Sequence, residues 1–84
     1  MSTKEKLLRR LLSMPSDFSF TEAATLLKHF GFEQSNKGKT SGSRVLFVNS
    51  DGVVIILHRP HPDNCLRHYQ IKQIIGVLTS EGLI

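Results

Sequence analysis

The stretch "RVLFVNSDGVVIILH" (residues 44–58) decides the fold. Both of its halves are apolar and rich in β-branched residues, which favour strands. Asp51 and Gly52 lie between the halves, and Asp-Gly is a strong hairpin signal because glycine adopts positive φ without strain. We therefore predict an antiparallel hairpin with strands over residues 43–49 and 53–58, at the centre of a small sheet.

Helical patterns lie on both sides of this hairpin. Ser19 and Glu22 fit a capping box and Gly31 suits the left-handed position after a helix, so we predict a helix over residues 19–30. Another helix is predicted over residues 69–81, closed by Gly82. Both apolar stripes need a common surface, so we expect both helices on one face of the sheet. Apolar residues recur at helical spacing, namely Ala23, Leu26, Leu27 and Phe30, and then Ile71, Ile74, Ile75 and Leu78.

Three further segments complete the predicted order of elements. An additional amphipathic helix is predicted over residues 3–13, and Pro15 ends it. The segment "FEQSNK" is a weaker candidate for a third strand before the hairpin. Two helices, three strands and a last helix predict an α+β sandwich. Gly76 lies inside the last helix, where glycine costs about 1 kcal/mol relative to alanine, so we expect close backbone packing there.

Composition restricts the class of protein. The 84 residues predict one domain, and 39% hydrophobic residues exclude a disordered chain. No apolar run approaches the roughly 20 residues that span a bilayer, and the N-terminus is too charged for a signal peptide, so a cytoplasmic protein is expected. Cys65 is the only cysteine, which excludes an internal disulfide. Eleven Lys and Arg against seven Asp and Glu give a net charge of +4, which favours a polyanionic partner.

Four stretches in this order resemble the HicA toxin family: "DFSFTEAATLLKHFGFE", "GSRVLF", "RPHP" and "YQIKQIIGVLTSEGLI". The resemblance covers residues 17–84, and residues 1–15 form an additional N-terminal helix within a single domain of residues 1–84. It implies a fold like that of a double-stranded-RNA-binding domain. It also implies ribosome-independent cleavage of mRNA and a HicB-type antitoxin that covers the active surface. No membrane partner and no cofactor are predicted.

Arg44 stands where the family usually carries its catalytic histidine, after Gly-Ser on the first hairpin strand. RNA cleavage without a metal needs a base for the 2′-hydroxyl proton, an acid for the leaving oxygen and positive charge at the phosphate. Arginine stays protonated, so Arg44 is predicted to hold a phosphate through its planar donor fork. His61, in the Pro-His-Pro turn, is the first candidate for proton transfer and His58 the second, because histidine titrates near neutrality. A structural role for each histidine remains an alternative.

A basic track is predicted around Arg44. Leu46 and Val48 share its face of the strand, whereas Val45 and Phe47 take the other face. Arg44 is therefore expected at the rim of the sheet, where substrate can reach it. The predicted RNA-binding residues are Lys37, Lys39, Ser43, Arg44 and Arg59.

Two alternatives stay open at this point. With Arg44 in place of histidine, the chain can instead be a non-catalytic RNA- or protein-binding module on the same fold. A small zinc-binding domain is the other alternative, because His58, His61, Cys65 and His68 are residue types that bind Zn²⁺ at short spacings. This spacing matches no strong signature, so no metal site is predicted.

Overall fold

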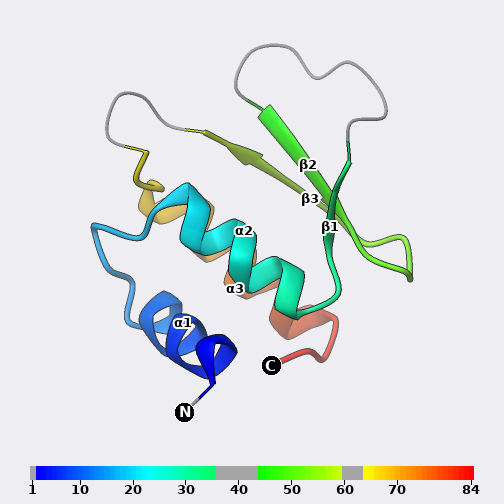
Figure 1. The fold of residues 1–84 in the computed structure, drawn as a ribbon, viewed down its shortest axis with the longest axis horizontal. Coiled ribbons are helices and arrows are strands. Elements are labelled where there is room, and N and C mark those ends of the chain that lie inside the picture. Colours follow the sequence, from blue (N-terminus) through cyan, green and yellow to red (C-terminus); the bar gives the residue numbers. More distant parts are fainter. Residues whose placement is uncertain (1, 36–43, 60–63) are drawn as a thin grey trace.

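The computed structural model describes residues 2–35, 44–59 and 64–84. Three antiparallel strands form one sheet in the order β1-β2-β3 (Figure 1). The α+β prediction is confirmed, and most predicted ends differ from the observed ones by a single residue, because capping residues lie outside the elements. The likeness to a double-stranded-RNA-binding domain stays a prediction. The elements are α1 (Thr3–Leu12), α2 (Phe20–His29), β1 (Glu33–Ser35), β2 (Arg44–Val48), β3 (Val54–His58) and α3 (His68–Ser80).

The hairpin between β2 and β3 closes through a short turn at the predicted Asp-Gly. Gly52 has a φ of 82°, and its N–H donates to the carbonyl of Asn49 at 3.1 Å. The side-chain oxygen of Asn49 accepts from the N–H groups of Asp51 and Val53, at 3.0 and 2.9 Å. The turn therefore fixes the register in which Val48 faces Val54.

The two ends of α2 carry the capping box and the glycine that were predicted from the sequence. Ser19 accepts from the N–H of Glu22 at 3.0 Å, and the Glu22 carboxylate accepts from the N–H of Ser19 at 3.1 Å. At the other end Gly31 has a φ of 89°. The N–H of Phe32 donates back to the carbonyl of Leu27 at 2.9 Å, which directs the chain into β1.

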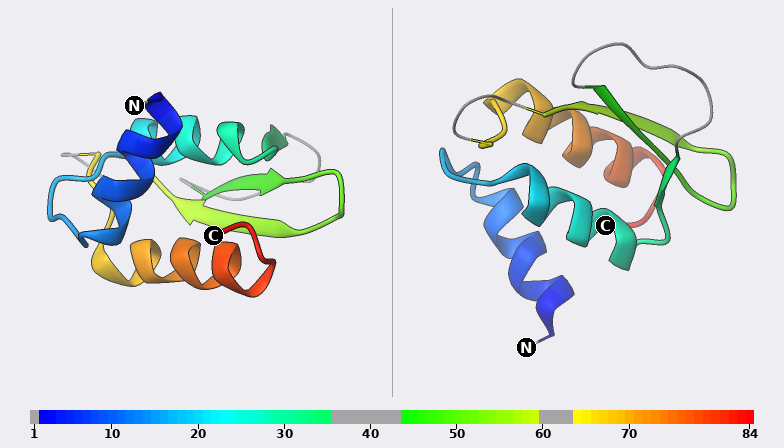
Figure 2. Two further views of the ribbon diagram at one scale, coloured as in Figure 1. Left: turned by 90° about the horizontal axis from the view of Figure 1, so that it is seen from below. Right: turned by 45° about the horizontal axis from the view of Figure 1, so that its top comes forward.

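Helices α2 and α3 cover the same face of the sheet, as predicted. The inward side chains of the hairpin are Val45, Phe47, Ile55 and Leu57, and the last three are buried. In Figure 1 the sheet lies above α2 and α3, and Figure 2 shows these two helices side by side, α2 in cyan and α3 in orange. The opposite face of the sheet carries alternate residues of the same strands, and no described helix packs on it.

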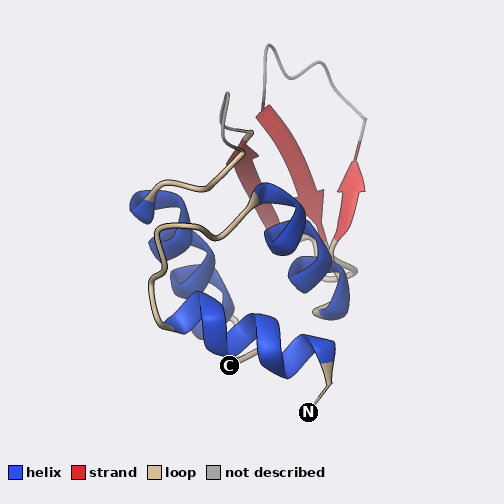
Figure 3. Cartoon of the chain, turned by 60° about the vertical axis from the view of Figure 1, so that its left-hand side comes forward, coloured by secondary structure: helices blue, strands red, loops and turns tan. Residues whose placement is uncertain are grey.

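The additional helix α1 packs on α2 and α3, away from the sheet (Figure 3). Leu11 is fully buried, and Arg10 holds the start of α2. The Arg10 guanidinium donates to both carboxylate oxygens of Glu22, at 2.9 and 3.3 Å, and to Asp17 at 3.3 Å. The hydrogen bond to Glu22 raises the pKa of Arg10 above its usual value, against the opposing effect of desolvation. The capping box of α2 therefore also anchors α1.

The expectation of close backbone packing at Gly76 is wrong. Apart from its chain neighbours and the nearby backbone of its own helix, a Cβ added to this glycine would meet no atom within 4 Å, and its φ is not positive. Residue 76 is exposed on α3, so glycine there lowers the helix propensity and makes no close packing contact that would offset the loss.

Gly76→Ala should therefore stabilise the fold by about 1 kcal/mol. For a domain of this size that raises the melting temperature by about 4–8 °C, measured by circular dichroism. Gly82→Ala is the matched control, because Gly82 has a φ of 72° and alanine would be strained there. A lower melting temperature in Gly76→Ala would contradict the expectation.

Candidate functional site

Arg44 and His58 face each other across the β2–β3 hairpin. They are direct partners in the antiparallel register, and both are exposed. Directly opposed residues have Cβ atoms about 4.5–5.5 Å apart, so two long polar side chains can contact the same ligand group. Both residues lie on the face of the sheet that the helices leave uncovered. Arg44 and His58, two of the residues predicted for the site, are therefore brought together.

A shallow pocket of about 230 Å³ opens at this pair. Its lining residues come from three elements: Arg44 from β2, Ile56 and His58 from β3, and Tyr69 and Gln70 from α3. Pockets for whole small molecules usually measure about 300–1,000 Å³. The size suits one part of an extended ligand better than a whole metabolite.

The first turns of α3 hold the edge strand β3. Gln70 is 2% exposed, and its side-chain oxygen accepts from the N–H of His58 at 2.7 Å. The amide of Gln73 donates to the carbonyl of Ile56 at 3.2 Å. These two side chains fix the backbone under His58. Sequence reasoning missed Gln70, although its place four residues before Ile74 puts a polar residue on the buried stripe of α3.

Arg59 is directed elsewhere. Its guanidinium carbon lies 4.6 Å from the centre of the Phe20 ring, at the start of α2. The Phe20 ring packs in turn against Phe47, with the ring centres 6.1 Å apart. The structure therefore does not place Arg59 in the pocket with Arg44 and His58, and its predicted contact with RNA would lie on another side of the strand.

Four predicted site residues lie outside the described residues, namely Lys37, Lys39, Ser43 and His61. Within the described part of the chain, no three His, Cys, Asp or Glu residues gather as metal ligands. The zinc alternative therefore gains no support from His58, Cys65 and His68. Cys65 is half-buried and forms a β-bridge with Ser19, which ties the chain before α3 to the start of α2.

Comparison with known proteins identifies the family. A family profile described as "HicA toxin of bacterial toxin-antitoxin" matches residues 20–78, from the first residue of α2 to the last turns of α3. The chain belongs to the HicA toxin family. Neither the search of curated proteins nor the search of solved structures gave a match. As a HicA toxin the protein functions in a toxin–antitoxin pair, and α1 lies outside the matched segment.

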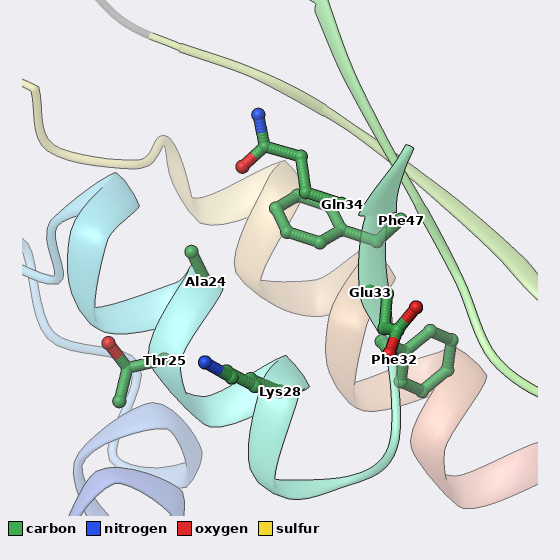
Figure 4. A pocket seen from close by; sticks show the side chains of 7 residues that line it. All are labelled: Ala24, Thr25, Lys28, Phe32, Glu33, Gln34 and Phe47. Carbon is green, nitrogen blue, oxygen red and sulfur yellow. The ribbon is translucent and has the colours of Figure 1, made fainter. Parts of the chain in front are cut away.

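A larger pocket of this HicA toxin lies elsewhere. Figure 4 shows it between α2 and β1, with a volume of about 480 Å³. Its charged side chains, Lys28 and Glu33, have opposite signs, and it contains none of the predicted site residues. We place the candidate site at the smaller pocket, because it combines the cation of Arg44 with the imidazole of His58.

The uncovered face of the sheet continues from the site as an apolar surface. Val54 and Ile56 are 47% and 42% exposed, and Leu46 and Val48 lie beside them, half-buried. Within residues 2–35, 44–59 and 64–84, no helix is both long and apolar enough to cross a membrane.

Gln70→Leu should destabilise this HicA toxin by about 1–3 kcal/mol, because leucine fills the space but leaves the N–H of His58 without its acceptor. Urea unfolding followed by circular dichroism measures the loss. Gln73→Leu is the matched control and should cost less, because its bond to Ile56 is exposed. Equal losses in the two variants would show that the buried hydrogen bond of Gln70 contributes no more to stability than the exposed one of Gln73.

Proposed function

We propose that this HicA toxin is a cytoplasmic ribonuclease that binds and cleaves mRNA. The observation that carries the proposal is the placement of Arg44 opposite His58 on the uncovered face of the sheet. The family resemblance adds that Arg44 stands where a catalytic histidine is usual. A cation and one acid–base side chain on neighbouring strands would supply two of the three functions that cleavage through the 2′-hydroxyl requires, and a second acid–base group would supply the third.

The proposed reaction needs no external reactant. The 2′-oxygen attacks the adjacent phosphorus as its proton passes to a base, a cyclic phosphate forms, and the 5′-oxygen leaves with a proton from an acid. Arg44 donates to the phosphate oxygens and stabilises the charge that grows on them. His58 and His61 are the candidates for the two proton transfers. His58 is favoured for one of them by its place beside Arg44.

Affinity for RNA would come mainly from phosphate contacts. Lys37, Lys39 and Ser43 precede Arg44 in the chain and would extend the contact along the RNA backbone. Arg59 would add a phosphate contact on the side of Phe20.

The proposed protein partner is a HicB-type antitoxin that covers the site. The exposed side chains of Val54 and Ile56, on the same face of the sheet as Arg44 and His58, support this assignment. An apolar surface that a partner buries, with charged residues at its rim, has the composition of a protein–protein interface.

A binding module without turnover is the second candidate. The observation that favours it is Arg44 itself, because arginine cannot accept the 2′-hydroxyl proton as the family's histidine can. Such a protein would bind RNA, or the partner protein, through the same face.

Inducible expression in bacteria distinguishes the two candidates. The toxin is expressed with and without the product of the adjacent gene, and growth and mRNA integrity are followed. A ribonuclease should arrest growth and fragment mRNA, and the partner should prevent both. Growth arrest with intact mRNA would favour the binding module, and no effect on growth or mRNA would oppose a toxic ribonuclease.

A further inference from the structure

Tyr69 is the one aromatic residue of this chain that exposes most of its surface. The sequence holds five phenylalanines, one tyrosine and no tryptophan. All five phenylalanines are buried or half-buried, whereas Tyr69 is 62% exposed. Its exposure follows from the helix, because the buried stripe of α3 begins with Gln70 and Ile71 and directs residue 69 outward.

The position of Tyr69 is fixed relative to the candidate site. It precedes Gln70, whose buried side chain accepts the N–H of His58 at 2.7 Å. Tyr69 also lines the pocket that contains Arg44 and His58. Among the described residues that line this pocket, none is acidic, so nothing there repels a phosphate. The ring, the cation and the histidine therefore border one small space.

We infer that Tyr69 is a stacking platform for an unpaired RNA base next to the phosphate that Arg44 holds. This inference rests on the proposed function and deepens it, because it assigns single-stranded RNA as the substrate class. The Tyr69 ring would make the protein prefer single-stranded RNA to duplex RNA, whereas the phosphate contacts would bind both.

The physical basis is the accessibility of the base face. In a duplex each base is stacked between its neighbours, so an exposed ring on a protein cannot reach it. In a single strand a base can turn outward and stack on an aromatic side chain, with little dependence on which base it is. A shallow pocket with an aromatic wall and a cation can accept one base and its phosphate.

The protein carries its own probe for this contact. Tyr69 is the only tyrosine and there is no tryptophan, so the tyrosine emission of the protein comes from Tyr69 alone. Wild-type toxin is titrated with a short single-stranded RNA that is 2′-O-methylated to prevent cleavage, and separately with a duplex of the same sequence. We expect the single strand to quench the emission and the duplex to leave it nearly unchanged.

Variants measure what the ring contributes, with labelled single-stranded RNA followed by fluorescence anisotropy. Tyr69→Leu should weaken binding about 5- to 150-fold, because it keeps an apolar side chain but removes the stacking surface. Tyr69→Phe keeps the ring and should recover most of the affinity. Leu12→Ala is the matched control for loss of an exposed apolar side chain, because Leu12 is 50% exposed on α1, away from the sheet.

The outcomes separate this inference from the proposed function. If wild-type toxin binds no RNA, both are overturned. If RNA binds and Arg44→Ala weakens it, but Tyr69→Leu binds RNA as tightly as the wild type and single-stranded RNA does not quench the wild-type emission, the inference is wrong and the proposed function stands. It is equally wrong if duplex and single strand quench alike, or if Tyr69→Leu weakens only the binding of the partner protein.

Discussion

Replacing His58 with glutamine should lower the rate of RNA cleavage by about 10²–10⁴-fold, the usual contribution of a general acid or base. Glutamine keeps polarity and approximate size but cannot accept and return a proton. The bond from the His58 N–H to Gln70 uses the backbone, so the variant retains it. The affinity for RNA should change little, because the phosphate contacts remain.

Single-turnover cleavage of a labelled RNA measures the effect, and the binding of the 2′-O-methylated RNA serves as the control. His61→Gln is measured in parallel, because His61 is the other candidate for proton transfer. A large loss in both variants would assign one histidine to each proton transfer. Cleavage by His58→Gln at the wild-type rate would refute the role of His58 and leave His61 or a substrate-assisted route.

Local signals in the sequence were enough to predict most of the fold. Ser19 and Glu22 mark the start of α2 because a capping box depends on residues three positions apart. Gly31 marks its end because positive φ strongly favours glycine. The period of two along β2 separated Arg44, Leu46 and Val48 from Val45 and Phe47, and the structure shows that the second set faces the helices. The segment "FEQSNK" was harder to place, and only Glu33–Ser35 of it is a strand.

The surroundings of Gln70, Arg59 and Gly76 could not be predicted, because they depend on tertiary contacts that no local pattern encodes. Gln70 lies on an apolar stripe, yet its partner is a backbone group twelve residues away, on β3. Arg59 follows the strand next to His58, but stacking on Phe20 turns it away from Arg44. Gly76 was expected to pack closely because glycine is costly in a helix, and the neighbouring space is open.

Two residues of the candidate site, Arg44 and His58, were named from the sequence, whereas Gln70 and Tyr69 were not. Arg44 and His58 were both candidates, and the hairpin register makes them direct partners. Arg44 and His58 become partners through the turn at Gly52. A sequence can indicate such a turn, but it does not fix the register of the two strands that the turn joins. Tyr69 reaches the same pocket only because α3 packs against the edge strand, a contact that cannot be read from residues 68–80 alone.

Arg44→Ala should lower the cleavage rate by about 10²–10³-fold, the usual loss when one donor to a developing oxyanion is removed. It should also weaken RNA binding, and the slope of log affinity against log salt should fall by about one, because one phosphate contact is lost. Arg44→Lys separates charge from geometry. Lysine restores the charge and the salt slope, but not the two parallel hydrogen bonds of the guanidinium, so cleavage should recover only in part.

Arg44→His decides between the two proposed functions. It places the family's usual residue opposite His58, so two acid–base side chains would face one phosphate. If the wild type is a ribonuclease, this variant should retain or raise cleavage, measured on the same labelled RNA. If only Arg44→His cleaves, the natural protein is a binding module that has lost an active site through this one position. If neither protein cleaves, although both bind single-stranded RNA, the uncovered face of the sheet binds RNA without catalysis and the ribonuclease proposal is wrong.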